Sequence, residues 1–88
     1  MYFTYILYSE SIKRYYKGHT VNIDARLKRH NNGEVNYTSK GIPWKLVLAL
    51  EKETRSDAMK LERKLKNLNR ERLEAFIVKY SHKNMDNS

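Results

Sequence analysis

The sequence predicts one small α/β (α+β) domain in which a three-stranded antiparallel sheet is flanked by helices. Two nearby stretches, residues 2–8 and 15–18, are rich in the β-branched and aromatic residues that favour strands. A helical spacing of apolar residues follows later in the chain. Because 88 residues leave room for a single core, we place the domain at residues 1–80. Residues 81–88 lack apolar periodicity, and we expect them to form a disordered tail.

The first two strands are expected to form a β-hairpin followed by a helix. A polar break separates the two strands, and Gly18 ends the second one. Asn22 is a plausible N-cap for a helix at residues 23–30. In that helix Arg26 and His30 are four residues apart and share a face. Both side chains could therefore look back at the hairpin.

The second half of the chain predicts a loop, a third strand and two helices. Residues 31–43 are dense in Asn, Gly, Ser and Pro, which is typical of a loop. Residues 44–51 form the most apolar run, and we expect a strand buried on both faces that forms the centre or core of the sheet. Thr54 or Ser56 would cap a helix at residues 57–67. A last helix, expected at residues 70–80, would close the core.

A carboxylate interrupts the apolar stripe of the helix at residues 57–67. Glu62 lies among Ala58, Leu61 and Leu65, whose spacing of three and four defines a buried face. A carboxylate turned toward a core must be paired, bound to a metal or placed at the edge of a cleft, because burying it alone costs several kcal/mol. Lys66, four residues later, offers an ordinary ion-pair alternative.

The charge of the chain favours a polyanionic partner. There are 18 Lys and Arg against 10 Asp and Glu, a formal net charge of +8. The alternative interpretation is a solubilising surface. The chain has no Cys, hence no disulfide framework and no thiolate metal site, so we expect a cytoplasmic location. No apolar stretch approaches the roughly 20 residues of a membrane helix, and we expect no membrane partner.

Between positions 2 and 69, tyrosines, a glycine, an arginine, a histidine and a glutamate follow one another in a characteristic order. In the order and spacing found here, they resemble the GIY-YIG nuclease superfamily, and within it the small stand-alone members similar to the nuclease domain of the bacterial excision-repair incision protein. The residues that carry the resemblance are Tyr5, Tyr16, Gly18, Arg26, His30 and Glu62. The resemblance implies a metal-dependent endonuclease that hydrolyses phosphodiester bonds in DNA, with a role in DNA repair; RNA and branched DNA are further candidate substrates.

The resemblance also implies a role for each catalytic candidate. Glu62 would hold one Mg²⁺ or Mn²⁺ ion, because a lone carboxylate is a usual anchor for such a hard cation. Arg26 would grip the scissile phosphate with its planar guanidinium. Tyr5 is the candidate for activating water and Tyr16 for orienting water or phosphate. A tyrosine with a pKa near 10 needs help at neutral pH, and His30 is placed to share its proton.

Four further residues are expected to contact nucleic acid. They are Lys17, His19, Tyr37 and Lys40. His19 stands where relatives often carry a phosphate-binding Lys. Tyr37 either places another aromatic hydroxyl near the site or covers the edge of the core.

Three departures distinguish the chain from the family pattern. Phe3 and Thr4 stand where the family has Gly and Ile, and Lys17 stands where an aliphatic residue is typical. The late Asn of the family has two candidates here, Asn67 and Asn69.

Two alternative functions remain at the level of sequence. The first is a nucleic-acid-binding module of the same fold that does not cut. The second is an interaction protein whose basic face meets an acidic partner. In either case, a homodimer or a partner protein could supply targeting that so small a domain lacks.

Overall fold

The computed structural model describes residues 1–86, which form three strands and four helical segments. In chain order these are β1 (Tyr2–Ser9), β2 (Arg14–Thr20), α1 (Ile23–Asn31), the 3₁₀ helix η1 (Asn36–Gly41), β3 (Trp44–Lys52), α2 (Arg55–Lys66) and α3 (Arg70–Asp86). Within the described residues, no helix is both long and apolar enough to cross a membrane.

The sheet is three-stranded and antiparallel, as predicted, but its central strand is β1. The strand order is β2-β1-β3, which places β3 at an edge. The prediction that residues 44–51 form a strand buried on both faces is therefore wrong; Leu46, for example, is 40% exposed. The strand buried on both faces is β1, whose four residues from Thr4 to Leu7 are all buried. Thr4 is tolerated there because its hydroxyl donates to the carbonyl of Ala58 at 2.8 Å.

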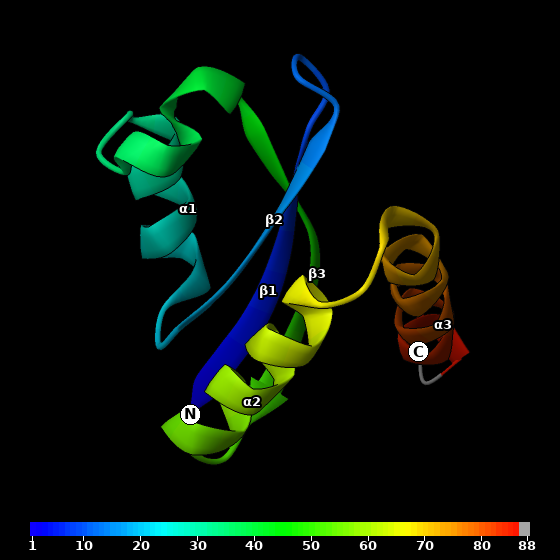
Figure 1. The fold of residues 1–88 in the computed structure, drawn as a ribbon. Coiled ribbons are helices and arrows are strands. Elements are labelled where there is room, and N and C mark those ends of the chain that lie inside the picture. Colours follow the sequence, from blue (N-terminus) through cyan, green and yellow to red (C-terminus); the bar gives the residue numbers. More distant parts are fainter. Residues whose placement is uncertain (87–88) are drawn as a thin grey trace.

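Helices cover both faces of the sheet, as Figure 1 shows, with α1 and η1 on one side and α2 and α3 on the other. Successive residues of β1 point to opposite faces, which divides the core in two. Tyr5 packs with Leu7 and Trp44 on the α1 side. Ile6 packs with Leu48 and residues of α2 and α3 on the other side.

The predicted helix caps explain where α1 and α2 begin. The Asn22 side chain accepts a hydrogen bond from the Ala25 N–H at 3.0 Å, which confirms it as the N-cap of α1. Thr54, rather than Ser56, caps α2, because its hydroxyl oxygen accepts from the Asp57 N–H at 3.1 Å.

The region predicted as a loop at residues 31–43 contains η1, which is attached to the start of β3. The indole N–H of Trp44 donates to the Thr38 carbonyl at 2.7 Å. The Asn31 side chain accepts from the Trp44 N–H at 2.7 Å and donates to the Trp44 carbonyl at 3.1 Å. These bonds hold η1 against α1 and the sheet, so this segment is ordered although its composition is typical of a loop.

The last helix is longer than the sequence indicates. α3 continues to Asp86, beyond the predicted end at Tyr80, so residues 81–86 are helical rather than a tail. Residues 87–88 lie outside the described residues.

Candidate active site

Tyr5 lies directly over Gly18, its partner across the β1–β2 ladder. A Cβ atom at Gly18 would come within 2.6 Å of the Tyr5 hydroxyl oxygen and 2.8 Å of the adjacent ring carbon. Real side chains do not approach so closely, so the tyrosine ring requires a glycine at this position of β2. Packing against Tyr5 thus explains why position 18 is a glycine.

A buried hydrogen-bond chain links Tyr5 to α1 and η1. The Tyr5 hydroxyl lies 3.0 Å from Nε2 of His30, and Nδ1 of His30 lies 2.7 Å from the Thr38 hydroxyl. Thr38 donates its single hydroxyl proton to the Val35 carbonyl. Nδ1 of His30 must therefore carry the ring proton and donate to Thr38, while Nε2 accepts from Tyr5. The predicted approach of His30 to the hairpin is confirmed.

The surroundings keep both members of this pair neutral at pH 7. Burial, together with the charges of Arg26 and Arg29, holds the pKa of His30 below its ordinary value. Burial, and next the neighbouring Tyr16, raises the pKa of Tyr5 to about 12, against the opposing effect of Arg26. Tyr5 is therefore a protonated donor in this arrangement, and free phenolate is not available at neutral pH.

Arg26 lies beside this pair, on the face of α1 that the sequence predicted. Its charge acts on the pKa of both Tyr5 and His30. The half-buried side chain lines a small pocket of about 160 Å³ together with His19 and Arg55. Arg26 therefore lies near the Tyr5 hydroxyl and also borders solvent-accessible space.

Glu62 approaches the same region from α2 and is held by two nitrogen atoms. Its Oε1 lies 2.5 Å from Nδ1 of His19, and its Oε2 lies 2.7 Å from Nζ of Lys66. Burial acts to raise the pKa of Glu62, but the hydrogen bonds from Lys66 and His19 outweigh it and hold the pKa below its usual range. The carboxylate is ionised at neutral pH, 17% exposed, and borders a pocket of about 150 Å³. Two of the sequence alternatives are thereby combined, the ion pair with Lys66 and the edge of a cleft.

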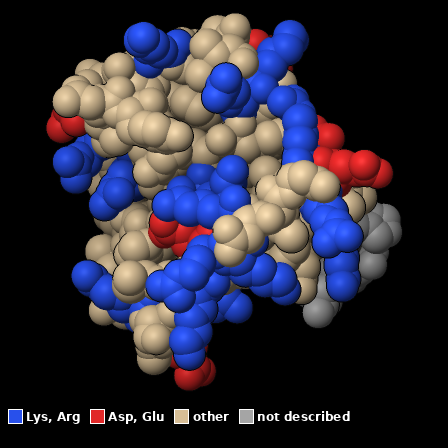
Figure 2. Space-filling view, in the orientation of Figure 1, with Lys and Arg blue, Asp and Glu red and all other residues tan. Residues whose placement is uncertain are grey.

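These side chains line a groove that follows β2. The pocket at Glu62 shares His19 with the pocket at Arg26, and it shares Lys66 with a larger pocket of about 500 Å³. We define the β2 groove by the residues Tyr16, Lys17, His19, Arg26, Tyr37, Glu62 and Lys66. Lys and Arg side chains gather around it in Figure 2, with a small acidic area among them.

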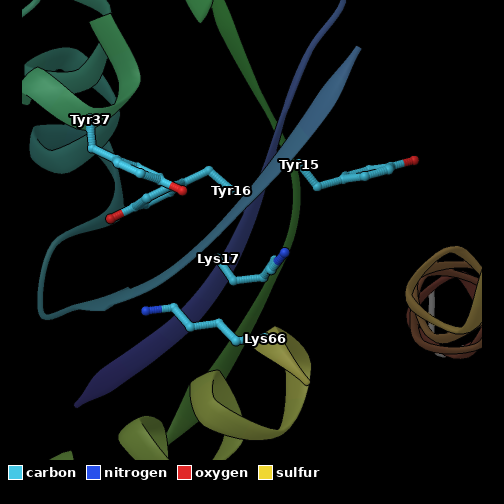
Figure 3. A pocket seen from close by; sticks show the side chains of 5 residues that line it. All are labelled: Tyr15, Tyr16, Lys17, Tyr37 and Lys66. Atoms are coloured by element: carbon cyan, nitrogen blue, oxygen red, sulfur yellow. The ribbon is translucent and has the colours of Figure 1, made fainter. Parts of the chain in front are cut away.

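Two tyrosines form one wall of the larger pocket, opposite two lysines (Figure 3). The ring centroids of Tyr16 and Tyr37 are 5.9 Å apart, with a tilt of 51°. Tyr37 is 85% exposed, so it does not cover the edge of the core. Tyr15, Lys17 and Lys66 complete the lining. Burial, and next the charge of Lys66, lowers the pKa of Lys17. The pocket combines aromatic faces with positive charge.

Three further sequence candidates lie beside the groove or outside it. Lys40 is exposed and lines an adjoining pocket of about 600 Å³ that also includes Tyr16 and Tyr37. The Asn69 side chain accepts from the Arg72 N–H at 2.8 Å and caps α3, while Asn67 ends α2. Neither asparagine belongs to the residues that define the groove.

The groove offers a divalent cation one carboxylate. Among the described side chains, those of residues 1–81, no group of three or more His, Cys, Asp or Glu is arranged to hold a metal ion. A single ionised carboxylate in an open pocket fits Mg²⁺ or Mn²⁺, which keep several waters and take phosphate oxygens as ligands. Because Lys66 occupies one oxygen of Glu62, it would have to give way to the ion.

Three contacts of this site could not be found from the sequence. Thr38 orients His30 through its hydroxyl, but no local pattern marks it as a partner of that histidine. The pairing of His19 with Glu62 joins residues 43 positions apart, without a local pattern. The approach of Tyr16 to His30, with ring centroids 4.9 Å apart, likewise depends on the tertiary fold.

Comparison with known proteins identifies the family of this chain. The family model of the GIY-YIG catalytic domain matches residues 1–76. The UPF0213 protein YsiG of Lactococcus lactis subsp. lactis is 40% identical over 62 residues, which cover 69% of this chain and 59% of that protein. A UPF0213 protein of Bacillus licheniformis is 38% identical over 72 residues, covering 81% of this chain and 74% of its own length.

A solved structure shows the same fold. The solution NMR structure of the UPF0213 protein BH0048 from Bacillus halodurans has a TM-score of 0.57 and 30% sequence identity, and the match covers 88% of this chain and 83% of that chain. The matched stretch of the Lactococcus relative is less than two thirds of that relative's length. With the family model spanning most of the chain, and with tyrosines, arginine, histidine and glutamate in the order of the family, the chain belongs to the GIY-YIG nuclease family.

Proposed function

We propose that this chain is a metal-dependent endonuclease that hydrolyses phosphodiester bonds in DNA. One observation carries the proposal: the β2 groove brings an ionised carboxylate, a guanidinium and tyrosine hydroxyls to the edge of one strand. Hydrolysis of a phosphodiester requires a deprotonated water, charge neutralisation on the non-bridging oxygens and stabilisation of the leaving oxygen. Membership of a nuclease family supports the same function.

In this scheme, Arg26 and the lysines of the groove bind phosphate. The Arg26 guanidinium can donate to two oxygens at once, and its partial burial strengthens such bonds. Lys17 adds positive charge in the larger pocket. The 85% exposed ring of Tyr37 is available to stack on a base, which suits nucleic acid better than a small phosphate ester.

Tyr5 and His30 would transfer the proton of the attacking water without forming free phenolate. The Tyr5 oxygen accepts a proton from water as its own proton passes to Nε2 of His30, along the 3.0 Å hydrogen bond. Hydroxide then attacks phosphorus, the bond between phosphorus and the leaving oxygen breaks, and the leaving oxygen takes a proton from solvent. This scheme departs from a role for Tyr5 as an isolated base, because a pKa of about 12 makes the phenolate too costly at neutral pH.

Glu62 would hold the divalent ion through its carboxylate. When bound there, Mg²⁺ or Mn²⁺ supplies the charge that neutralises the phosphate oxygens. Nδ1 of His19, 2.5 Å from the carboxylate, fixes its orientation.

A specific observation also favours a second function, a nucleic-acid-binding module that does not cut. Both oxygens of Glu62 are already engaged by nitrogen atoms, so the carboxylate could be a purely structural partner of His19 and Lys66. The positive charge and exposed Tyr37 would then suffice for binding. Such binding should weaken with salt, with log K falling by about 0.9 per neutralised phosphate for each tenfold increase in salt.

The two functions are separated by Glu62→Gln in a nicking assay on supercoiled plasmid with Mg²⁺ or Mn²⁺. The endonuclease proposal requires that the wild type nicks the plasmid and that a folded Glu62→Gln protein does not, with metal binding lost. Glu10→Gln is the matched control, because Glu10 is also an ion-paired carboxylate but lines none of the pockets of the β2 groove. Branched DNA and RNA are tested in parallel. Metal-dependent nicking by folded Glu62→Gln would refute the assignment, and a wild type that binds DNA without cutting it favours the binding module.

A further inference from the structure

Lys66 borders two pockets of the β2 groove. One, at Glu62, would hold a cation, and the other, at Lys17, would hold a phosphate anion. Nζ of Lys66 lies 2.7 Å from Oε2 of Glu62, in the pocket where a cation would bind. The same side chain lines the larger pocket with Tyr16, Lys17 and Tyr37, which Figure 3 shows. Lys66 is therefore within reach of either pocket.

The contact with Glu62 occupies the position that a metal ion would need. His19 already lies against Oε1 of Glu62, so Oε2 is the oxygen that an incoming cation can take at the cost of a single ion pair. Of the two partners of Glu62, the side chain of Lys66 is 53% exposed and that of His19 is 28% exposed. The lysine is thus the partner that can leave, and it can do so by side-chain rotation without a change in α2.

The ammonium group of Lys66, once released from Glu62, could enter the pocket of about 500 Å³ only if an anion were bound there. None of its five lining residues is acidic, and Lys17 already brings positive charge to it. Lys17 and Lys66 line the same pocket with like charges, and burial, then the charge of Lys66, lowers the pKa of Lys17. A phosphate between them would offset these like charges, and the hydroxyls of Tyr16 and Tyr37 could donate to it.

We propose that Lys66 is an internal substitute for the divalent ion at Glu62 and becomes a phosphate ligand beside Lys17 when the ion binds. This inference rests on the proposed metal site at Glu62. It gives Lys66 two opposite effects: the lysine opposes cation binding to the free protein, and it supports phosphate binding to the metal-bound protein.

The first test is a Mn²⁺ titration of the protein without nucleic acid, by calorimetry or by electron paramagnetic resonance of free Mn²⁺. Lys66→Gln should bind Mn²⁺ about three- to tenfold more tightly, because the competing ion pair is gone. Lys64→Gln is the matched control, since it removes the same charge from an exposed position of α2 that does not line the groove. Its Mn²⁺ affinity should stay within about twofold of the wild type.

The second test uses thymidine 3′,5′-bisphosphate, which offers phosphates but no internucleotide bond. Without metal, Lys66→Gln and the wild type should bind it with affinities within about twofold, because Glu62 retains Lys66. With saturating Mn²⁺, Lys66→Gln should bind it at least about threefold more weakly than the wild type.

Equal Mn²⁺ affinity in the wild type and Lys66→Gln overturns the inference, as does absence of Mn²⁺ binding to both. The same loss of bisphosphate affinity with and without Mn²⁺ also overturns it. The nicking assay distinguishes this failure from failure of the endonuclease proposal. If the wild type nicks DNA and Lys66→Gln has the Mn²⁺ affinity of the wild type, only the role of Lys66 is refuted. Melting curves of both variants verify that they are folded.

Discussion

Removal of the Tyr5 hydroxyl tests the buried hydrogen-bond chain most directly. In Tyr5→Phe, Nε2 of His30 loses the hydroxyl that lies 3.0 Å away in the wild type. His30 is 0% exposed, so water cannot replace that hydroxyl. Neither tautomer of the imidazole avoids the loss. If Nδ1 carries the proton, Nε2 is an unsatisfied acceptor; if Nε2 carries it, Nε2 is an unsatisfied donor.

The expected cost is that of one buried polar atom left without a partner, about 1–3 kcal/mol. For a domain of this size, each kcal/mol corresponds to about 4–8 °C, so the melting temperature should fall by about 5–20 °C. Circular dichroism on heating measures this fall. Tyr37→Phe is the matched control, because it removes the same hydroxyl from an 85% exposed ring, and its melting temperature should change by less than about 3 °C.

A double variant shows whether the cost arises from the hydrogen bond. Tyr5→Phe/His30→Leu replaces both partners by apolar groups, and such replacements can be nearly neutral because no polar atom is stranded between them. The combined loss should therefore be smaller than the sum of the single losses, by about 1–2 kcal/mol. Additive losses, or a Tyr5→Phe protein that melts at the wild-type temperature, would refute the reasoning.

Three further predictions concern the site. Gly18→Ala places a Cβ 2.6 Å from the Tyr5 hydroxyl oxygen and should destabilise the fold by about 1–3 kcal/mol by overpacking; an unchanged denaturation midpoint contradicts this. Arg26→Ala should lower the nicking rate at least about 100-fold with little change in melting temperature, since a phosphate ligand acts in the transition state; normal cutting excludes this role. Because the pKa of folded His30 lies below 6.5, the unfolded chain binds more protons, so stability should be retained above pH 6.5 and lost as the pH falls below it. Calorimetry from pH 7 to 5 should show that the stability of His30→Gln depends less on pH than that of the wild type. Equal dependence of stability on pH in the two proteins would count against a buried neutral imidazole.

The elements of the fold could be predicted because their signals are local. The cap at Asn22 and the helical spacing of Ala58, Leu61 and Leu65 each depend on a few neighbouring residues. The order of the strands could not be derived in this way. β3 has the most apolar sequence, yet β1 is central. The Thr4 hydroxyl is tolerated in that buried strand because it donates to a carbonyl 54 residues away, a contact that no local pattern reveals.

The site shows the same division between local and long-range information. Arg26 and His30 could be paired because they lie one turn apart on α1, and Lys66 could be considered a partner of Glu62 for the same reason. The bond between His19 and Glu62 and the orientation of His30 by Thr38 join separate elements. These contacts decide which oxygen of Glu62 is open to exchange and which nitrogen of His30 accepts a proton, so the chemistry of the groove required the tertiary structure.

If metal and nucleic acid both bind the groove as proposed, its charges predict that they bind cooperatively. Glu62 is the single carboxylate among the residues that define the β2 groove, which also include Lys17, Arg26 and Lys66. A divalent ion alone would add positive charge to this surface, and phosphate alone would find Lys66 already engaged with Glu62. Each ligand lessens the unfavourable charge met by the other, and the coupling free energy must be the same in both directions. The affinity of the free protein for the divalent ion should therefore be lower than that of the protein bound to nucleic acid. Phosphate oxygens of the nucleic acid would then complete the metal site.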